Sequence, residues 1–306
     1  MFPVAVPFSY KEGAAMLKQN RSIWVVGGDL RQVELAKLLT DDGHWVQTYA
    51  MEHRPSPSPL SGSDTLQGID AADCVILPLP LCAEDGILNA PLSGRKVSVR
   101  SVLDQLRPGQ FICAGRVNIP VEQYARSKNL TILDYFQREE LAVMNAVPTV
   151  EGALQIAMEE LPTTLFGTRV LVIGFGRLGR LLALRLRALG AKVTVSARKY
   201  ADLAWIEAYG CCSEHTDQLD GWLGGYALVI NTVPALILDR ARLHDLDEGA
   251  LVIDLASRPG GVDYPAAAEL GVKALHALSL PGKVAPATSG KIIRDTIYHM
   301  WQEVEA

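Results

Sequence analysis

Several features that would identify common protein classes are scarce in this sequence. Its 306 residues include only five cysteines, scattered and without a C-x-x-C pair, so we expect neither a disulfide framework nor a structural zinc site. The formal net charge is -5, which lacks the basic surplus that a nucleic-acid binder needs to displace phosphate counterions. The expected partner is therefore a small molecule or another protein, and no metal site is predicted.

Signals for targeting and for membrane insertion are also missing. The longest apolar runs are interrupted by glycine, proline or charge, so none is expected to span a bilayer. The first residues, MFPVAVPFSYKEG, lack a basic region followed by an apolar one, as a signal peptide would have. We expect a reduced, cytoplasmic protein, in which the first twenty or so residues are an extension.

The sequence shows no obvious acid–base machinery. Six histidines are present, and none stands in the arrangement with a carboxylate that 2-hydroxyacid dehydrogenases use. A Ser/His/Asp hydrolase pattern is not evident either. His276 lies in an apolar strand pattern and is expected to be a core residue.

Short apolar strands do alternate with helical patterns along the whole chain, which is typical of parallel sheets built from βα units. We therefore predict an α/β protein with two Rossmann-like, doubly wound parallel-sheet domains and an inter-domain cleft. A Pro/Ser-rich surface loop is expected at 54–64. Strands are expected at 22–28, 44–50, 72–80, 110–117 and 130–135, and again at 168–176, 191–198, 226–234, 250–256 and 272–278.

The segment GFGRLG has the G-x-G-x-x-G spacing, directly after a predicted strand and at the start of a predicted helix. Gly174 permits the tight turn, Gly176 lets a pyrophosphate approach the backbone, and Gly179 allows close packing of helix on sheet. Free N–H groups at the helix start would then point at the phosphates. The predicted cofactor-binding residues here are Gly174, Phe175, Gly176, Arg177, Leu178 and Gly179.

The end of the next strand, VTVSARK, indicates which dinucleotide binds. NAD enzymes commonly have an Asp or Glu at this position, where it bonds the ribose 2′-hydroxyl, and this sequence has none. Ser196, Arg198 and Lys199, with Ala197 between them, are predicted to hold the 2′-phosphate of NADP. The alternative is an exposed basic turn without a ligand.

Three parts of the chain are predicted from these patterns. Residues 1–147 are expected to form an N-terminal Rossmann-like substrate domain and residues 148–285 the NADP-binding Rossmann domain. A helix between Pro148 and Pro162 would run between the halves. Residues 286–306 are expected to form a helix that packs back on the N-terminal domain, through an apolar face consisting of Ile292, Ile293, Ile297 and Met300.

The first-half loop, GGDLRQ, departs from the dinucleotide pattern. Gly27, Asp29 and Gln32 take the three glycine positions; Asp29 would repel a pyrophosphate, and Gln32 would prevent its close approach. Asp29 and Arg31 are therefore predicted to be exposed substrate-binding groups. The alternative is that Asp29 has no substrate role and only caps the helix that follows.

Ligands of open α/β sheets lie outside the carboxyl ends of the strands. At these ends we predict that Ser257 and Arg258 meet the substrate, because an Arg offers a fixed fork suited to a carboxylate. The alternative for Arg258 is a salt bridge with Asp254 or Asp263. The remaining predicted cofactor contacts are Asn231, Thr232, Val233, Pro234, Ala256 and Gly282.

Further candidates for the substrate lie in the first half and at the junction. Arg116 is either a second carboxylate partner or a surface charge. Thr149 and Glu151 are predicted to contact the substrate, although Glu151 could simply stabilise a helix start. The predicted catalytic set is Ser257, Arg258 and Glu151.

A resemblance to a known family rests on longer stretches, which occur in order from about Ser22 to the end of the chain. These are GGDLRQ, VILPLP, NAVPTVEGALQIAME, VLVIGFGRLGR, NTVPALIL, DLASRPGGVD and LPGKVAPATSGKII. Together they resemble the family of the dipicolinate synthase A subunit, which is found in spore-forming bacteria.

The resemblance implies an enzyme of the lysine branch pathway that acts during sporulation, in the mother cell. It would remove a hydride from dihydrodipicolinate, or from its hydrated precursor, and pass it to NADP+. A flavoprotein, the B subunit of that enzyme, is expected to carry FMN and would be the partner in a homo- or hetero-oligomer. The implied fold resembles that of alanine dehydrogenase and adenosylhomocysteinase.

Two other functions stay open on the sequence alone. One is a related two-domain NAD(P)-dependent dehydrogenase for an amino or oxo acid. The other is a non-catalytic, NADP-binding scaffold for the flavoprotein.

Overall fold

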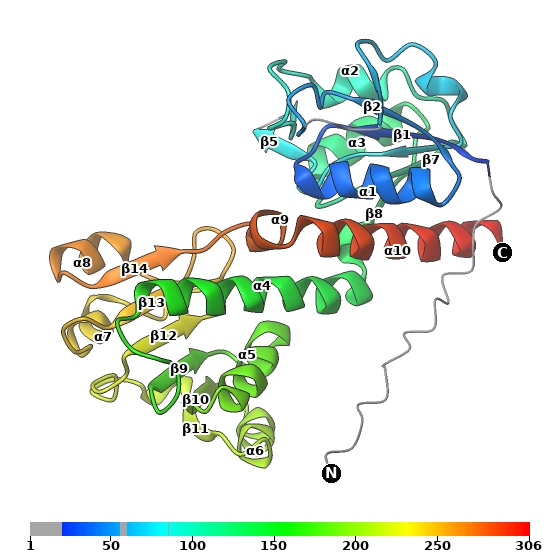
Figure 1. The fold of residues 1–306 in the computed structure, drawn as a ribbon. Coiled ribbons are helices and arrows are strands. Elements are labelled where there is room, and N and C mark those ends of the chain that lie inside the picture. Colours follow the sequence, from blue (N-terminus) through cyan, green and yellow to red (C-terminus); the bar gives the residue numbers. More distant parts are fainter. Residues whose placement is uncertain (1–19, 56–59, 85) are drawn as a thin grey trace. The chain divides into compact units, whose positions relative to one another are not determined.

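The computed structural model describes residues 20–55, 60–84 and 86–306, which form two compact units (Figure 1). The first unit contains the described residues up to Leu141 together with Pro286–Ala306, and the second contains Ala142–Ala285. The extension expected at the start of the chain lies outside the described residues, except for Asn20.

The first unit contains a six-stranded parallel sheet in the order β3-β2-β1-β4-β7-β8. This order reverses direction at β1, so it is the doubly wound order of a Rossmann fold. The short strand β3 lies inside the segment predicted to be entirely loop, and it is added at the sheet edge beside β2. The elements are β1 Ser22–Val26, α1 Leu30–Asp41, β2 Trp45–Tyr49, β3 Ser61–Ser63, η1 Ile69–Ala71, β4 Cys74–Ile76, β5 Cys82–Glu84, β6 Ile87–Leu88, α2 Val99–Leu103, β7 Phe111–Ala114, α3 Ile119–Ser127, β8 Ile132–Asp134 and η2 Tyr135–Gln137.

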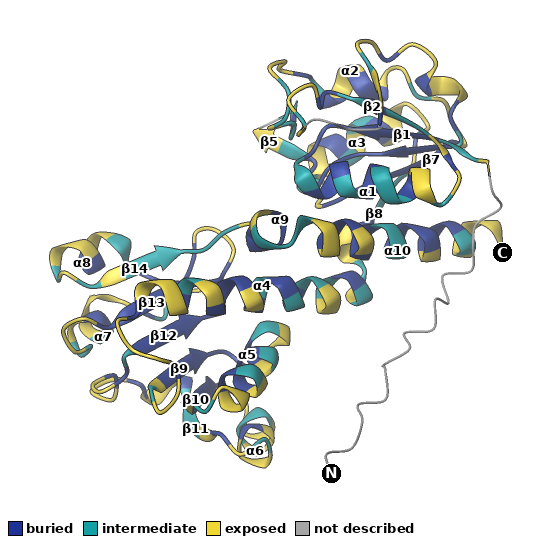
Figure 2. Cartoon of the chain, viewed as in Figure 1, coloured by how far each residue is buried: buried dark blue, intermediate teal, exposed yellow. Residues whose placement is uncertain are grey.

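The second unit repeats this plan with a six-stranded parallel sheet, β11-β10-β9-β12-β13-β14. Its central strands β9, β12 and β13 are buried on both faces, which explains their uninterrupted apolar sequences (Figure 2). The predicted fold class, two Rossmann-like parallel-sheet domains, is confirmed. The elements are β9 Arg169–Ile173, α5 Arg177–Ala188, β10 Lys192–Ala197, α6 Tyr200–Ala208, β11 Cys212–His215, η3 Thr216–Gln218, β12 Leu228–Asn231, α7 Arg240–His244, β13 Leu251–Asp254, α8 Tyr264–Glu269, β14 Lys273–His276 and α9 Leu280–Val284.

Helix α4, Glu139–Glu160, begins well before the predicted start, so Pro148 lies inside it. The expectation that this proline begins the helix, and with it a domain boundary between residues 147 and 148, is corrected: the units change at Leu141/Ala142. Proline removes one backbone donor, and the helix continues because apolar side chains on both sides of it are buried in the two cores.

By length and composition alone, α4 is also apolar enough to cross a membrane, which corrects the expectation that no such segment exists. In the second unit its residues Val150, Ala153, Leu154 and Ala157 belong to the hydrophobic core beneath β9 and α5. Core helices of globular units have this composition.

The C-terminal helix α10, Pro286–Glu305, packs along α1 in the first unit (Figure 1). Its apolar face is buried, as the spacing of its isoleucines predicts. The two helices approach closely at Gly290, where a Cβ would lie 2.9 Å from the carbonyl oxygen of Arg31 and from the backbone nitrogen of Leu35. A glycine is required there because those neighbours are backbone atoms, which cannot turn aside.

Candidate functional site

The glycine loop between β9 and α5 has the geometry that dinucleotide binding requires. Gly174 has φ +99°, and a Cβ on Gly179 would lie 2.0 Å from the carbonyl oxygen of Gly174. A Cβ on Gly176 would meet no atom within 4 Å, so the backbone there is open to a ligand. No side chain of the described residues caps the α5 N-terminus at Gly176, which leaves its N–H groups for an anion.

The neighbours of these glycines have different environments. Phe175 is buried, with its ring edge against Tyr209 and the Arg180 guanidinium over its face. Leu178 is half-buried, and Arg177 is exposed beside the open backbone of Gly176. Of the two, only Arg177 presents its side chain to solvent at the start of α5.

The predicted cofactor residues at the end of β10 differ in their exposure to solvent. Arg198 and Lys199 are exposed, and neither makes an ion pair with another described residue. Ser196 is fully buried, and its hydroxyl is 3.4 Å from the hydroxyl of Thr216. The expected contact of Ser196 with a 2′-phosphate is therefore corrected: strand alternation directs its side chain into the unit. Ala197 is buried as well.

The loop after β12 is shaped by Asn231, which is also fully buried. Its amide nitrogen donates to the carbonyl of Val233 at 2.9 Å, and its amide oxygen accepts the Val233 N–H at 3.1 Å. The Asn231 side chain is thus engaged within the protein, while the predicted position of residue 231 beside the cofactor stays a prediction. Thr232, whose hydroxyl donates to the Ile173 carbonyl, and the exposed Pro234 remain at this edge.

Arg258 and Ser257 follow β13 and are both exposed. Neither acidic candidate pairs with Arg258 in the described part of the chain. Asp254 accepts four hydrogen bonds from uncharged donors, and Asp263 caps α8 by accepting the Ala266 N–H at 3.0 Å. The salt bridge considered as the alternative is thus absent among these residues, while the role of Arg258 in binding a substrate stays a prediction.

Two further predicted cofactor residues, Ala256 and Gly282, are buried. Ala256 is buried, and its carbonyl oxygen lies 2.8 Å from Nε2 of His276. Gly282 is buried within α9. His276 is half-buried rather than a full core residue, and it stacks on Tyr264. Burial, reinforced by the neighbouring Asp254 carboxylate, raises the pKa of the Tyr264 phenol, which keeps it a neutral donor.

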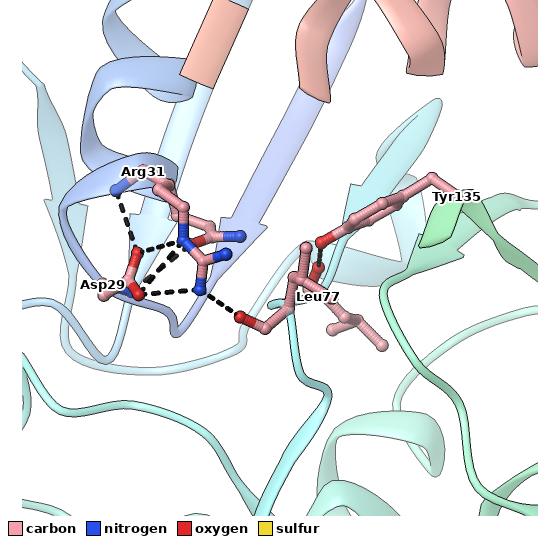
Figure 3. Close-up of polar contacts among 6 residues, drawn as sticks. Asp29, Arg31, Leu77 and Tyr135 are labelled. Atoms are coloured by element: carbon pink, nitrogen blue, oxygen red, sulfur yellow. Dashed lines mark hydrogen bonds and ion pairs between the residues drawn. The ribbon is translucent and has the colours of Figure 1, made fainter. Parts of the chain in front are cut away.

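In the first unit, Asp29 and Arg31 are engaged with each other (Figure 3). Asp29 caps α1 in a capping box with Gln32, which is the alternative that the sequence left open. Arg31 is 5% exposed, and its guanidinium donates to Asp29 and to the carbonyl of Leu79. The prediction that Arg31 is exposed is therefore wrong, because its guanidinium is buried and donates a hydrogen bond to the carbonyl of Leu79, far along the chain.

Arg116 differs from Arg31, because it is exposed and has no ion pair among the described residues. It follows β7 with φ +59°, a left-handed conformation that is uncommon outside glycine. The Asp134 carboxylate holds this turn by accepting the N–H groups of Arg116 and Val117, each at 2.9 Å. The turn thus fixes the backbone and leaves the guanidinium available.

Thr149 and Glu151 both lie on α4, and both are engaged by other residues of the second unit. The Thr149 hydroxyl donates to the Asn145 carbonyl of its own helix. Glu151 pairs with Arg185 at 3.2 Å, in a groove of about 610 Å³ between α4 and α5. Arg185 is near the C-terminal end of α5, about 12 Å along the axis from Arg177 at its start. This placement disagrees with the predicted catalytic contact of Glu151.

Comparisons with known proteins agree with this geometry. A family model for the N-terminal domain of the dipicolinate synthase A subunit matches residues 22–136. The dipicolinate synthase A subunit of Bacillus subtilis (strain 168) is 34% identical over 288 residues, which cover 93% of this chain and 97% of that protein. This chain belongs to the dipicolinate synthase A family. The resemblance predicted from the sequence motifs is confirmed.

The solved structures extend the comparison to the fold. The crystal structure of the dipicolinate synthase A subunit from Bacillus halodurans is 29% identical and superposes with a TM-score of 0.84, over 92% of this chain and 97% of that one. An L-alanine dehydrogenase is 13% identical with a TM-score of 0.61, over 92% and 90%, and so shows the expected common fold alone. Residues 145–270 also match the D-isomer specific 2-hydroxyacid dehydrogenase, NAD binding domain family, which supports a nicotinamide cofactor on the second unit.

Proposed function

We propose that this chain transfers a hydride from dihydrodipicolinate, or from its hydrated precursor, to NADP+ and so forms dipicolinate. The observation that carries the proposal is Arg258, exposed and without an ion pair among the described residues, in the same unit as the open glycine loop. Strands β9, β12 and β13 are neighbours in one parallel sheet, so Arg258 follows the same sheet edge as the glycine loop. A carboxylate substrate is the ligand that such a guanidinium suits.

The residues of the second unit fit a bound dinucleotide, because the backbone at Gly176 is open and no described side chain caps the α5 N-terminus. When bound, NADP+ supplies the hydride acceptor. Arg258 holds one carboxylate of the planar substrate, and the Ser257 hydroxyl donates a second hydrogen bond to it. Dihydrodipicolinate then loses a hydride and a proton as its ring becomes aromatic, and the hydrated precursor loses a water in addition.

Aromatisation itself favours this reaction, so the protein mainly has to hold the ring in position. Asp29 is already engaged by Arg31, and Glu151 by Arg185. We therefore assign the ring proton to water rather than to either carboxylate. In the first unit, Arg116 is a cation at a sheet edge without an ion pair among the described residues, and we propose it for a carboxylate of this substrate class.

Selection of NADP over NAD is assigned to Arg198 and Lys199, which directly follow β10, a strand without a carboxylate. Replacing Arg198 by aspartate should weaken NADPH binding about 10- to 100-fold, because a charged hydrogen bond is lost and the 2′-phosphate is repelled. NADH binding should change less than about threefold, because NADH has no phosphate at this position. Titration of both cofactors, followed by protein fluorescence, measures the two dissociation constants.

Lys192→Asp is the matched control, since it makes the same charge change at the opposite end of β10, where the side chain is also exposed. It should leave both affinities within about twofold, because exposed charges more than a Debye length apart are screened. Equal losses of NADPH and NADH affinity in Arg198→Asp would contradict the assignment of the 2′-phosphate.

The partner of this chain is proposed to be the flavoprotein B subunit of dipicolinate synthase, with FMN on that subunit rather than on this chain. We place the complex in the cytoplasm of the mother cell of a sporulating bacterium. Family membership supports this proposal, and the net charge of -5 agrees with a protein that binds neither nucleic acid nor an anionic membrane surface.

The function is tested by incubating the purified chain with NADP+ and freshly made dihydrodipicolinate, with and without the flavoprotein. Formation of NADPH in the presence of substrate supports the proposal. Reduction of NADP+ by amino or hydroxy acids instead would identify a related dehydrogenase, as the match to a 2-hydroxyacid dehydrogenase domain allows. No turnover even with the partner would leave only a cofactor-binding scaffold.

A further inference from the structure

Asp254, the last residue of β13, carries a carboxylate that the proposed chemistry does not use. Its side chain is fully buried, and no cation of the described residues pairs with it. A buried carboxylate is costly unless hydrogen bonds replace its hydration, so a full set of donors is expected around it.

Four uncharged donors surround the two oxygens of Asp254. Oδ1 accepts the Asn231 amide at 2.8 Å and the Ala256 N–H at 3.0 Å. Oδ2 accepts the Gly261 N–H at 2.8 Å and the Tyr264 hydroxyl at 2.9 Å. The carboxylate is therefore hydrogen-bonded to the loop backbone at Ala256 and at Gly261, on either side of Ser257 and Arg258.

The same carboxylate links this loop to the one after β12. Asn231 is held by both the N–H and the carbonyl of Val233, so its amide cannot turn over without losing both bonds. Gly260 also lies against the carboxylate. It has φ +94°, and a Cβ on it would lie 2.5 Å from Asp254 Oδ2. The backbone is thus packed directly on the carboxylate.

We propose that Asp254 is the positioning residue that fixes Arg258 for the carboxylate substrate. The inference rests on the proposed function, because it concerns the residues assigned there to substrate binding. Asp254 touches neither substrate nor cofactor; it acts by holding both ends of the loop that presents the guanidinium. Arg258 itself has no partner among the described residues to fix it, so the backbone must do so.

Asp254→Asn is the sharpest test, because it keeps the shape and removes half of the acceptor capacity. The locked Asn231 amide requires an oxygen at the Oδ1 position, so the new NH2 group must face the Gly261 N–H. The Tyr264 hydroxyl can rotate to accept, whereas the Gly261 N–H loses its acceptor. We expect the KM for dihydrodipicolinate to rise about tenfold, while the NADPH dissociation constant stays within about twofold.

A double-mutant cycle with Arg258→Ala separates positioning from general weakening of the fold. If Asp254 acts through Arg258, then Asp254→Asn should raise KM less than about twofold in the Arg258→Ala background. An equal factor in both backgrounds would overturn the inference. An unchanged KM in Arg258→Ala alone would contradict the proposed substrate role of Arg258. The inference about Asp254 would then be wrong as well, because it depends on that role.

Asp263→Asn is the matched control, because it makes the same chemical change in a nearby carboxylate that caps α8 without bonding the loop. Asn caps helices as well as Asp does, so KM should stay within about twofold. If Asp254→Asn fails to fold, Tyr264→Phe removes one of the four donors and keeps the carboxylate. It should raise KM about fivefold when Arg258 is present and less than about twofold in the Arg258→Ala background; an equal rise in both backgrounds would contradict the proposal.

Discussion

Gly179→Ala is expected to weaken NADPH binding about 10- to 100-fold. The added Cβ would lie 2.0 Å from the carbonyl oxygen of Gly174 and 2.9 Å from its carbonyl carbon, and both are backbone atoms. Helix α5 must therefore move away from β9, which costs about 1–3 kcal/mol and displaces the N–H groups intended for the pyrophosphate. Fluorescence titration with NADPH and thermal unfolding measure the two consequences.

Two further glycines serve as comparisons for this prediction. Gly224→Ala should affect neither property, because its Cβ would meet its nearest neighbour at an ordinary 3.6 Å. Gly176→Ala should leave stability unchanged, since nothing lies within 4 Å, but should weaken NADPH binding by occupying the pyrophosphate position. Normal NADPH affinity in Gly179→Ala would mean that the loop does not bind the cofactor.

Arg258→Ala is expected to raise the KM for dihydrodipicolinate roughly 10- to 150-fold. This factor corresponds to about 1.5–3 kcal/mol of lost binding free energy, as for the loss of a charged hydrogen bond. Stability should change little, because the side chain is exposed and makes no ion pair among the described residues. Steady-state kinetics at saturating NADP+, combined with thermal unfolding, measures both quantities.

A control for Arg258→Ala lies in the same unit. Arg240 is exposed as well and pairs with Glu269 on the surface, so Arg240→Ala removes an equal charge without touching the proposed site. Its KM should match that of the unchanged protein. An unaltered KM together with lowered stability in Arg258→Ala would instead mean that Arg258 has a structural role.

The part of the site that depends on local spacing could be predicted from the sequence. The three glycines of 174–179, the strand before them and the helix after them act within a few residues of each other, so the sequence indicates the geometry directly. The alternation of strands and helices likewise predicts two parallel sheets.

The burial of side chains that bond to residues far along the chain could not be predicted from local spacing. Arg31 was expected at the surface, but the Leu79 carbonyl, far along the chain, holds its guanidinium. Asn231 lies at a strand end as predicted, but it is fully buried, and its amide donates to the carboxylate of Asp254, 23 residues further along the chain. No local pattern reveals such partners, because the sheet brings them together only after folding.

Helix α4 shows the same limit from another direction. Proline is common in the first turn of a helix, so the sequence predicts that a helix begins at Pro148. The helix begins at Glu139 instead, because its buried apolar residues stabilise it on both sides of the proline. Glu151 consequently lies along the helix, paired with Arg185, rather than at a helix N-terminus.

The central claim is that this chain oxidises a dihydropyridine dicarboxylate with NADP+. The most direct measurement follows NADPH by its absorbance and dipicolinate by chromatography in one reaction, with the flavoprotein present. One NADPH is expected for each dipicolinate, and both products should be lost together in Gly179→Ala. Dipicolinate that forms without NADPH, at a rate unaffected by Gly179→Ala, would contradict it.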